Sequence, residues 1–128
     1  MSSAAYVPGR HVVEAYGAGG FRFAGMSHVG SILATPRGIA AVRATSIDEV
    51  DLTTLAPLFA ELAEAPGAIE FLILGAGAKM ARPPAALAAA LGERGLRFEA
   101  MATGPATRVY NVMIDEGRRV AALLIAAP

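Results

Sequence analysis

Cysteine is absent from this 128-residue sequence, and histidine occurs only as His11 and His28. The lack of cysteine excludes disulfides, thiolate catalysis and cysteine-ligated zinc or iron–sulfur sites. Two imidazoles are too few for a histidine-rich site within one chain, so we expect no metal. Charge is also scarce and balanced, with 11 basic and 11 acidic residues. Because nucleic-acid binders normally carry a basic stripe, and none is visible here, we expect no nucleic-acid partner.

Long apolar runs are missing as well. The best run, residues 120–127, is far shorter than the roughly 20 residues of a membrane-spanning helix. The first residues also lack the hydrophobic stretch of a secretory signal. We therefore predict a protein that is not integral to a membrane, cytoplasmic in a bacterium or in the mitochondrial matrix of a eukaryote. The length predicts one domain over residues 11–128, after a flexible lead-in at residues 1–10.

The N-terminal half contains short apolar stretches separated by turn residues. Two antiparallel hairpins are predicted from this pattern. The first joins residues 12–17 to residues 21–25 through a glycine-rich connection. The second joins residues 27–36 to residues 38–44 through the sequence TPRG, which suits a tight turn.

The pattern changes to helical spacing after residue 50. Leu55, Leu58 and Leu62 predict a helix over about residues 54–65. The apolar run at residues 69–75 is typical of a strand that is covered on both faces. Further helices are expected over about 84–93 and 104–116, the last capped by Thr103, with strands at 96–100 and 120–126. This order predicts an α/β domain in which helices pack on a mixed sheet.

The stretch FLILGAGAKM, residues 71–80, contains half of a dinucleotide-binding fingerprint. Gly75 and Gly77 follow a convincing strand, and Glu99 is placed where such folds bind ribose. Met80, however, occupies the third glycine position, where its side chain would obstruct helix–strand packing. The next helix also begins late, after a proline pair, and only one strand–helix–strand crossover follows. The sequence therefore favours a tight turn after a buried strand over a nucleotide site.

A narrower ligand site stays open at the carboxyl edge of the predicted sheet. If strands 69–75 and 96–100 are parallel neighbours, their C-terminal loops emerge beside the start of the 104–116 helix. Helix amides together with cations make an anion site. The candidate ligand residues are Gly75, Gly77, Lys79, Thr103, Arg108 and Asn111. The alternative is that Thr103 caps these amides and that the cations are solvated.

Other polar clusters are explained better by structure than by chemistry. Ser27, His28 and Ser31 place hydroxyls beside an imidazole, but no G-x-S-x-G motif or orienting carboxylate completes a triad. The acidic residues between 48 and 51 suit the positive end of a helix better than they suit a metal. We therefore predict no catalytic residues and no cofactor.

Three stretches together resemble one known family: SILATPRG, the GAG after the apolar strand, and EAMATGPATRVYNVMIDEGRRVAALLI. It is the uncharacterised small-domain family that includes the third assembly factor of mitochondrial respiratory complex I and the adipogenesis-associated Mth-type domain proteins. The resemblance spans roughly residues 11–127. Its most specific part is the series Thr103, Ala106, Arg108, Tyr110, Asn111, Glu116 and Arg118. Val42, Ala76 and Val109 depart from residues common in the family.

The resemblance implies a three-layer single domain, with a mixed central sheet flanked by helices and an additional β-hairpin layer. It also implies that no enzymatic activity is established for the family. We expect a non-enzymatic accessory or binding protein with protein partners, assisting assembly of a respiratory or other membrane complex. One alternative is a small-anion or nucleotide binder, or an enzyme, using the Gly75–Gly77 turn and the Thr103–Asn111 helix start. Another is a homo-oligomer whose alanine-rich helices pack across subunits.

Overall fold

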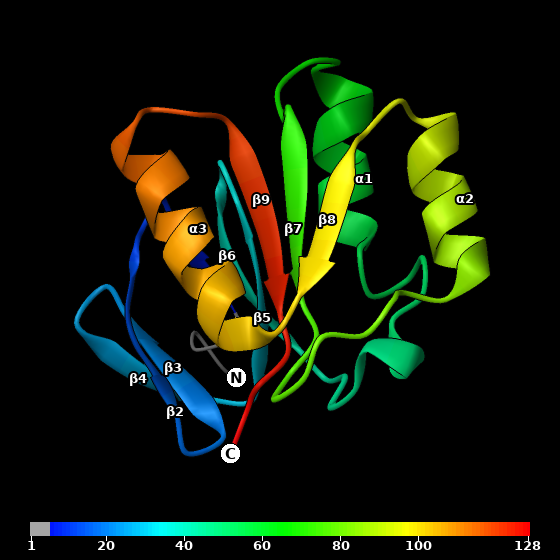
Figure 1. The fold of residues 1–128 in the computed structure, drawn as a ribbon. Helices are drawn as coiled ribbons and strands as arrows, with labels where there is room; N and C mark the ends of the chain where they lie inside the picture. Colours follow the sequence, from blue (N-terminus) through cyan, green and yellow to red (C-terminus); the bar gives the residue numbers. More distant parts are fainter. Residues whose placement is uncertain (1–5) are drawn as a thin grey trace.

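The computed structural model describes residues 6–128, which form two β-sheets and three α-helices (Figure 1). The strands are β1 (Tyr6–Pro8), β2 (Val13–Gly17), β3 (Gly20–Phe23), β4 (Met26–Val29), β5 (Ser31–Thr35), β6 (Gly38–Val42), β7 (Phe71–Gly75), β8 (Phe98–Met101) and β9 (Val120–Leu124). The helices are α1 (Ala56–Glu64), α2 (Ala85–Glu93) and α3 (Thr103–Asp115), with a short 3-10 helix, η2 (Ile47–Glu49).

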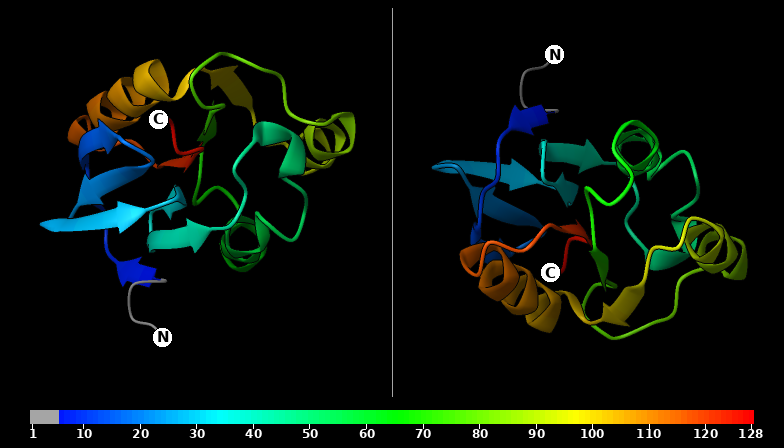
Figure 2. Two further views of the ribbon diagram at one scale, coloured as in Figure 1. Left: turned by 90° about the horizontal axis from the view of Figure 1, so that it is seen from below. Right: turned by 90° about the horizontal axis from the view of Figure 1, so that it is seen from above.

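The larger sheet has six strands in the order β1-β6-β5-β9-β7-β8, and the smaller sheet has the order β2-β3-β4. The pairs β1–β6, β6–β5 and β5–β9 are antiparallel, whereas β7 is parallel to both β9 and β8. Helices α1 and α2 cover one face of the larger sheet, while α3 and the smaller sheet cover the other (Figure 2). The predicted fold class is confirmed: a mixed central sheet lies between helices, with an extra β layer.

Strand β7 shows why its sequence is an unbroken apolar run. Leu72 and Leu74 pack into the core beneath α1 and α2, whereas Ile73 packs into the second core beneath α3 and the smaller sheet. All three side chains are fully buried. A strand that is covered on both faces has no solvent side on which to place polar residues. The central position of β7 follows from this pattern.

The second predicted hairpin differs from the structure at Gly30. Residues 27–36 do not form one strand, because β4 belongs to the smaller sheet and β5 to the larger one. Gly30 has φ = +100°, a conformation that side-chain-bearing residues rarely adopt, and the chain passes between layers there. Ser31 then fixes the start of β5, because its hydroxyl donates to the Ala44 carbonyl at 2.7 Å and accepts from the Ala126 amide at 2.9 Å.

The predicted lead-in at residues 1–10 also differs in its second half. Residues 1–5 lie outside the described residues. Residues 6–8 form β1, which pairs antiparallel with β6. The Gly9 amide then donates to the Arg37 carbonyl at 2.8 Å, which ties this segment to the β5–β6 turn. Pro8 is tolerated because β1 is an edge strand.

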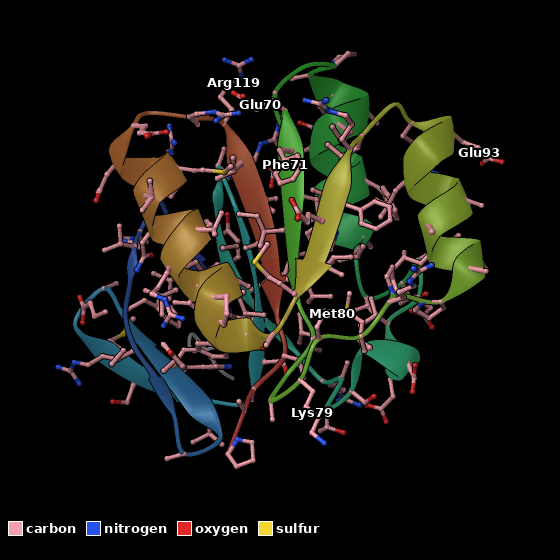
Figure 3. All side chains as sticks on the ribbon, in the orientation of Figure 1. Glu70, Phe71, Lys79, Met80, Glu93 and Arg119 are labelled. Atoms are coloured by element: carbon pink, nitrogen blue, oxygen red, sulfur yellow. The ribbon has the colours of Figure 1, made fainter. Side chains whose placement is uncertain are left out.

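An ion-pair network joins the start of β7 to the turn between α3 and β9. Arg118 donates from Nε and Nη2 to Oε1 of Glu70 at 3.1 and 3.0 Å. The Arg119 amide donates to the other carboxylate oxygen at 3.2 Å. Glu70 and Arg119 lie together at this end of the molecule (Figure 3). The Arg118 hydrogen bonds, supported by the Arg119 amide, hold the pKa of Glu70 below its usual value.

We expect Glu70→Gln to flatten the acid limb of the stability profile. A carboxyl whose pKa is lowered by folding contributes stability above its unfolded pKa of about 4.3 and loses it as pH falls through the folded value. When the pH is lowered from neutral to below the pKa of Glu70 in the folded protein, wild type should therefore lose more stability than Glu70→Gln. Urea unfolding at a series of pH values between these limits measures the difference. Glu93→Gln, on the exposed side of α2, serves as the control, and equal acid slopes for wild type and Glu70→Gln would contradict the expectation.

Candidate functional site

The candidate site lies where β7 and β8 end and α3 begins (Figure 1). The two strands are parallel neighbours, with Gly75 opposite Met101 in the register. The loop after β7 meets the start of α3, because the Thr103 amide donates to the Gly77 carbonyl at 2.8 Å. The predicted meeting of the glycine turn with this helix start is therefore present.

Thr103 does not cap α3, which corrects the sequence-based prediction. The N-cap position is Ala102, and no side chain caps it. Thr103 is the first helical residue and is fully buried. Its hydroxyl accepts a hydrogen bond from the Gly77 amide at 2.8 Å and donates one to the Ile125 carbonyl at 2.7 Å. The hydroxyl thus joins the loop after β7, the start of α3 and the end of β9.

Gly75 allows α3 to pack directly against β7. A methyl group at this position would lie 2.9 Å from Cδ2 of Leu124, 3.1 Å from Cβ of Ala106 and 3.1 Å from Cα of Thr103. Gly77 has φ = +103°, so the turn itself also favours glycine. The space directly beside Gly75 is thus filled by protein atoms. Both glycines therefore have a structural explanation.

The first turn of α3 offers little to an anion. Thr103 donates its amide to Gly77, Pro105 has no amide hydrogen, and the Ala106 amide donates to the Ala102 carbonyl. Within residues 6–128, only Gly104 of this turn has a backbone N–H without a protein acceptor. Tyr16 packs against Gly104, with its hydroxyl 2.8 Å from the position that a Gly104 side-chain carbon would take.

Arg108 and Asn111 reach from α3 to β2. Arg108 is exposed, and its Nη1 donates to the Tyr16 hydroxyl at 3.0 Å. The Asn111 amide accepts from the Val13 backbone N–H and donates to the Val13 carbonyl, each at 2.8 Å. Asn111 thereby pairs with the free edge of β2 as a neighbouring strand would. It binds α3 to the smaller sheet.

The six candidate residues therefore separate into three groups. Gly75, Gly77 and Thr103 form one buried packing unit. Arg108 and Asn111 contact β2. Lys79 is exposed in the loop that follows β7, and no hydrogen bond or ion pair within the described part of the chain engages its side chain (Figure 3).

We expect Asn111→Ala to lower the free energy of unfolding by about 1–2 kcal/mol, because it removes two partly buried hydrogen bonds and leaves the Val13 backbone groups without protein partners. Urea denaturation measures the loss. Val112→Ala is the matched control, since this neighbouring side chain is 56% exposed and should change stability by about 0.5 kcal/mol or less. Equal effects of the two substitutions would show that Asn111 does not anchor β2.

Two buried polar contacts were missed by sequence reasoning. Tyr110 on α3 donates its hydroxyl to the His11 carbonyl at 3.0 Å, and burial raises the pKa of Tyr110 to about 12, so this group stays a donor. Thr35 at the end of β5 donates to the carboxylate of Glu61 on α1, and both side chains are buried. The helical stripe placed Tyr110 on the buried face, but no local pattern marks its partner.

The remaining polar candidates have structural partners. His28 lies against Phe23 with ring centroids 6.1 Å apart, and its Nε2 lies 3.3 Å from the Ser31 carbonyl oxygen. The hydroxyl of Ser27 accepts from Arg22 at 3.2 Å. Across residues 6–128, no three His, Asp or Glu side chains gather in a way that could hold a metal ion. In the same range, no helix combines the length and apolarity needed to cross a bilayer.

Comparison with known proteins places the whole fold among bacterial relatives. A family model described as a protein of unknown function (DUF498/DUF598) matches residues 13–125. An uncharacterised protein of Rhodobacter capsulatus is 38% identical over 116 residues, which cover 91% of this chain and 85% of that protein.

Solved structures agree with this placement. A structure described as an outer membrane protein from Bartonella henselae is 40% identical, with a TM-score of 0.82, and the match covers 94% of this chain and 98% of that one. A Bordetella pertussis protein, described as a Mth938-like domain, is 25% identical with a TM-score of 0.74, and covers 98% and 88% respectively. The likeness therefore includes the edge formed by β7, β8 and α3.

Proposed function

This chain belongs to the family of proteins of unknown function DUF498/DUF598, and from that premise we propose that it is a non-enzymatic accessory protein that binds another protein. The observation that supports this proposal is that polar side chains at the candidate edge bind the protein itself. The side chains of Thr103 and Asn111 form their hydrogen bonds with backbone groups of the same chain. In residues 6–128, no buried side-chain nitrogen or oxygen lacks a partner. Such an arrangement fixes the shape of the surface but leaves few polar side chains available to take part in a reaction.

Two shallow grooves with exposed apolar side chains support a role in protein binding. Met80 is 60% exposed and borders a groove of about 580 Å³ between β8 and α2. Val112 is 56% exposed and, with Val109 and Met113, borders a groove of about 270 Å³ on the outside of α3. Methionine is enriched in protein interfaces, where its flexible side chain adapts to the partner.

The resemblance to respiratory assembly factors supports a proposal about the kind of protein partner. We propose that the partner is a subunit of a respiratory or other membrane complex during its assembly. The similar Bartonella protein is described as an outer membrane protein, which agrees with work at a membrane. A shared fold does not fix function, so this role needs a direct test.

The test is affinity capture of tagged protein from the native organism, with soluble and detergent-solubilised membrane fractions analysed by mass spectrometry. We expect one partner to be enriched from the membrane fraction. Met80→Glu and Val112→Glu should weaken capture through their respective grooves, because a charge would be desolvated there. Val29→Glu is the matched control, since Val29 is 90% exposed on the smaller sheet. Recovery of no specific partner under several conditions would refute the proposal.

A second candidate function is small-anion binding at the start of α3. The Gly104 amide, which has no protein acceptor within residues 6–128, and the exposed Arg108 guanidinium favour it, since both are groups that bind anions. A thermal-shift screen with nucleotides, phosphates and carboxylates tests this candidate. Stabilisation of wild type that is lost in Arg108→Ala and kept in Arg82→Ala would support it. If no compound raises the melting temperature, the anion site is rejected.

A further inference from the structure

The two edges of the larger sheet differ in how well they are protected. At one end, β1 is three residues long and contains Pro8, which has no N–H to offer a further strand. At the other end, β8 has the sequence FEAM, with neither proline nor lysine. Every residue of β8 therefore keeps its N–H, and an unpaired strand edge is a template for pairing with another chain. The free edge of β8 is therefore better suited to strand pairing than the edge of β1.

The backbone of β8 directs two residues toward this free edge. The Leu72 amide donates to the Arg97 carbonyl at 3.0 Å, and the Ala76 amide donates to the Met101 carbonyl at 2.8 Å. Alternate residues of a strand direct their N–H and C=O groups to opposite sides. Phe98 and Ala100 therefore point theirs away from β7. In the described part of the chain, no other strand pairs with them.

A groove and a loop lie beside β8. Phe98 and Ala100 line the groove of about 580 Å³ together with Ala85 and Ala88 of α2. Met80 borders the same groove and lies beside the C-terminal end of β8 (Figure 3). The loop after β7 therefore runs beside the C-terminal end of β8, and the start of the strand around Phe98 is the place considered for pairing.

We propose that β8 pairs antiparallel with β8 of a second copy of this chain, centred on Phe98. In this register the two Phe98 residues exchange both backbone hydrogen bonds. Arg97 of each copy then lies directly opposite Glu99 of the other, in the closer, non-hydrogen-bonded type of pair. Both side chains are exposed, and no ion pair within residues 6–128 uses either of them.

The charge pattern around Phe98 favours a second copy of this chain as the partner of β8. The sequence Arg-Phe-Glu is complementary to itself when reversed, which is what a two-fold interface requires. A register centred on Glu99 would set the two Glu99 carboxylates opposite each other, and like charges directly opposite are destabilising. A register centred on Ala100 would meet the loop that carries Met80. The Phe98 register avoids both conflicts and continues the central sheet across the dimer.

The test is a charge-reversal cycle followed by sedimentation equilibrium over a concentration series. Wild type should show a reversible monomer–dimer equilibrium. Arg97→Glu and Glu99→Arg each place like charges at both cross-strand pairs, so each should raise the dimer dissociation constant by roughly tenfold or more. The double variant R97E/E99R should dimerise as wild type does. An equimolar mixture of the two single variants should form a heterodimer, because every pair is again of opposite charge.

Two controls keep the result interpretable. Circular dichroism and thermal unfolding show that each single variant is folded, which is expected because both side chains are exposed. Lys79→Glu, which changes charge on a different loop, should leave the dissociation constant unchanged. A wild-type protein that stays monomeric at millimolar concentration overturns the proposal. A dimer dissociation constant that neither single charge reversal changes also overturns it.

Discussion

Replacing Thr103 with valine is expected to lower the free energy of unfolding by about 2–4 kcal/mol, because each backbone group that loses its only partner in a dry site costs about 1–3 kcal/mol. Valine keeps the shape of threonine but can neither accept from the Gly77 amide nor donate to the Ile125 carbonyl. Thr103 is 0% exposed, so water cannot replace the hydroxyl without rearrangement.

Thr107→Val is the matched control for this prediction. Thr107 is also buried, and its hydroxyl donates to the Thr103 carbonyl at 2.8 Å, a bond that runs back along the same helix. Because the helix ladder pairs that carbonyl as well, the loss of this hydroxyl should cost about 1 kcal/mol or less. Urea denaturation gives both values, and hydrogen exchange of the Gly77 amide shows whether the loop after β7 loosens. Equal losses in the two variants would mean that Thr103 does not join the three segments.

Features that depend on neighbouring residues could be predicted from the sequence. The apolar run at residues 69–75 indicated a strand covered on both faces, and β7 is buried on both. The helix expected over 84–93 is α2, Ala85–Glu93. Both patterns are periodic over a few residues, so the chain itself contains the required information. The meeting of the β7 loop with the start of α3 followed from the crossover rule for parallel strands.

The division between β4 and β5 could not be predicted in the same way. Residues 27–36 are compatible with one strand, and only the pairing partners separate them: β4 pairs with β3, and β5 pairs with β6 and β9. Those partners are fixed by packing between layers, which no short window of sequence contains. Gly30 was the one local signal, since a glycine inside a strand pattern often marks a change of direction.

The roles of the candidate site residues were missed for a related reason. Capping rules concern contacts within one helical turn, so they assigned Thr103 to its own helix. Its hydroxyl instead bonds to Gly77 and Ile125, which are 26 and 22 residues away in the chain. Asn111 bonds to Val13, 98 residues away. Polar residues at a sheet edge resemble a binding site in sequence, although long-range contacts can use them to hold layers together.

Replacing Gly75 with alanine is expected to lower the free energy of unfolding by about 2–3 kcal/mol, the range in which overpacked cores lose stability. The added methyl would lie 2.9 Å from Cδ2 of Leu124, which can rotate, but also 3.1 Å from the backbone Cα of Thr103, which cannot. Relief therefore requires α3 to move away from β7. The same movement would stretch the hydrogen bonds between Thr103 and the Gly77 loop.

Gly92→Ala in α2 is the control for this last substitution, because a methyl group there meets no atom within 4 Å. It should raise stability by about 0.5–1 kcal/mol, since alanine loses less backbone freedom than glycine when it enters a helix. Opposite signs for the same chemical change would show that close packing, rather than backbone freedom, explains Gly75. A Gly75→Ala protein as stable as wild type would instead mean that α3 can shift from β7. The turn would then have room for a ligand, and the anion-binding candidate would gain support over the accessory role.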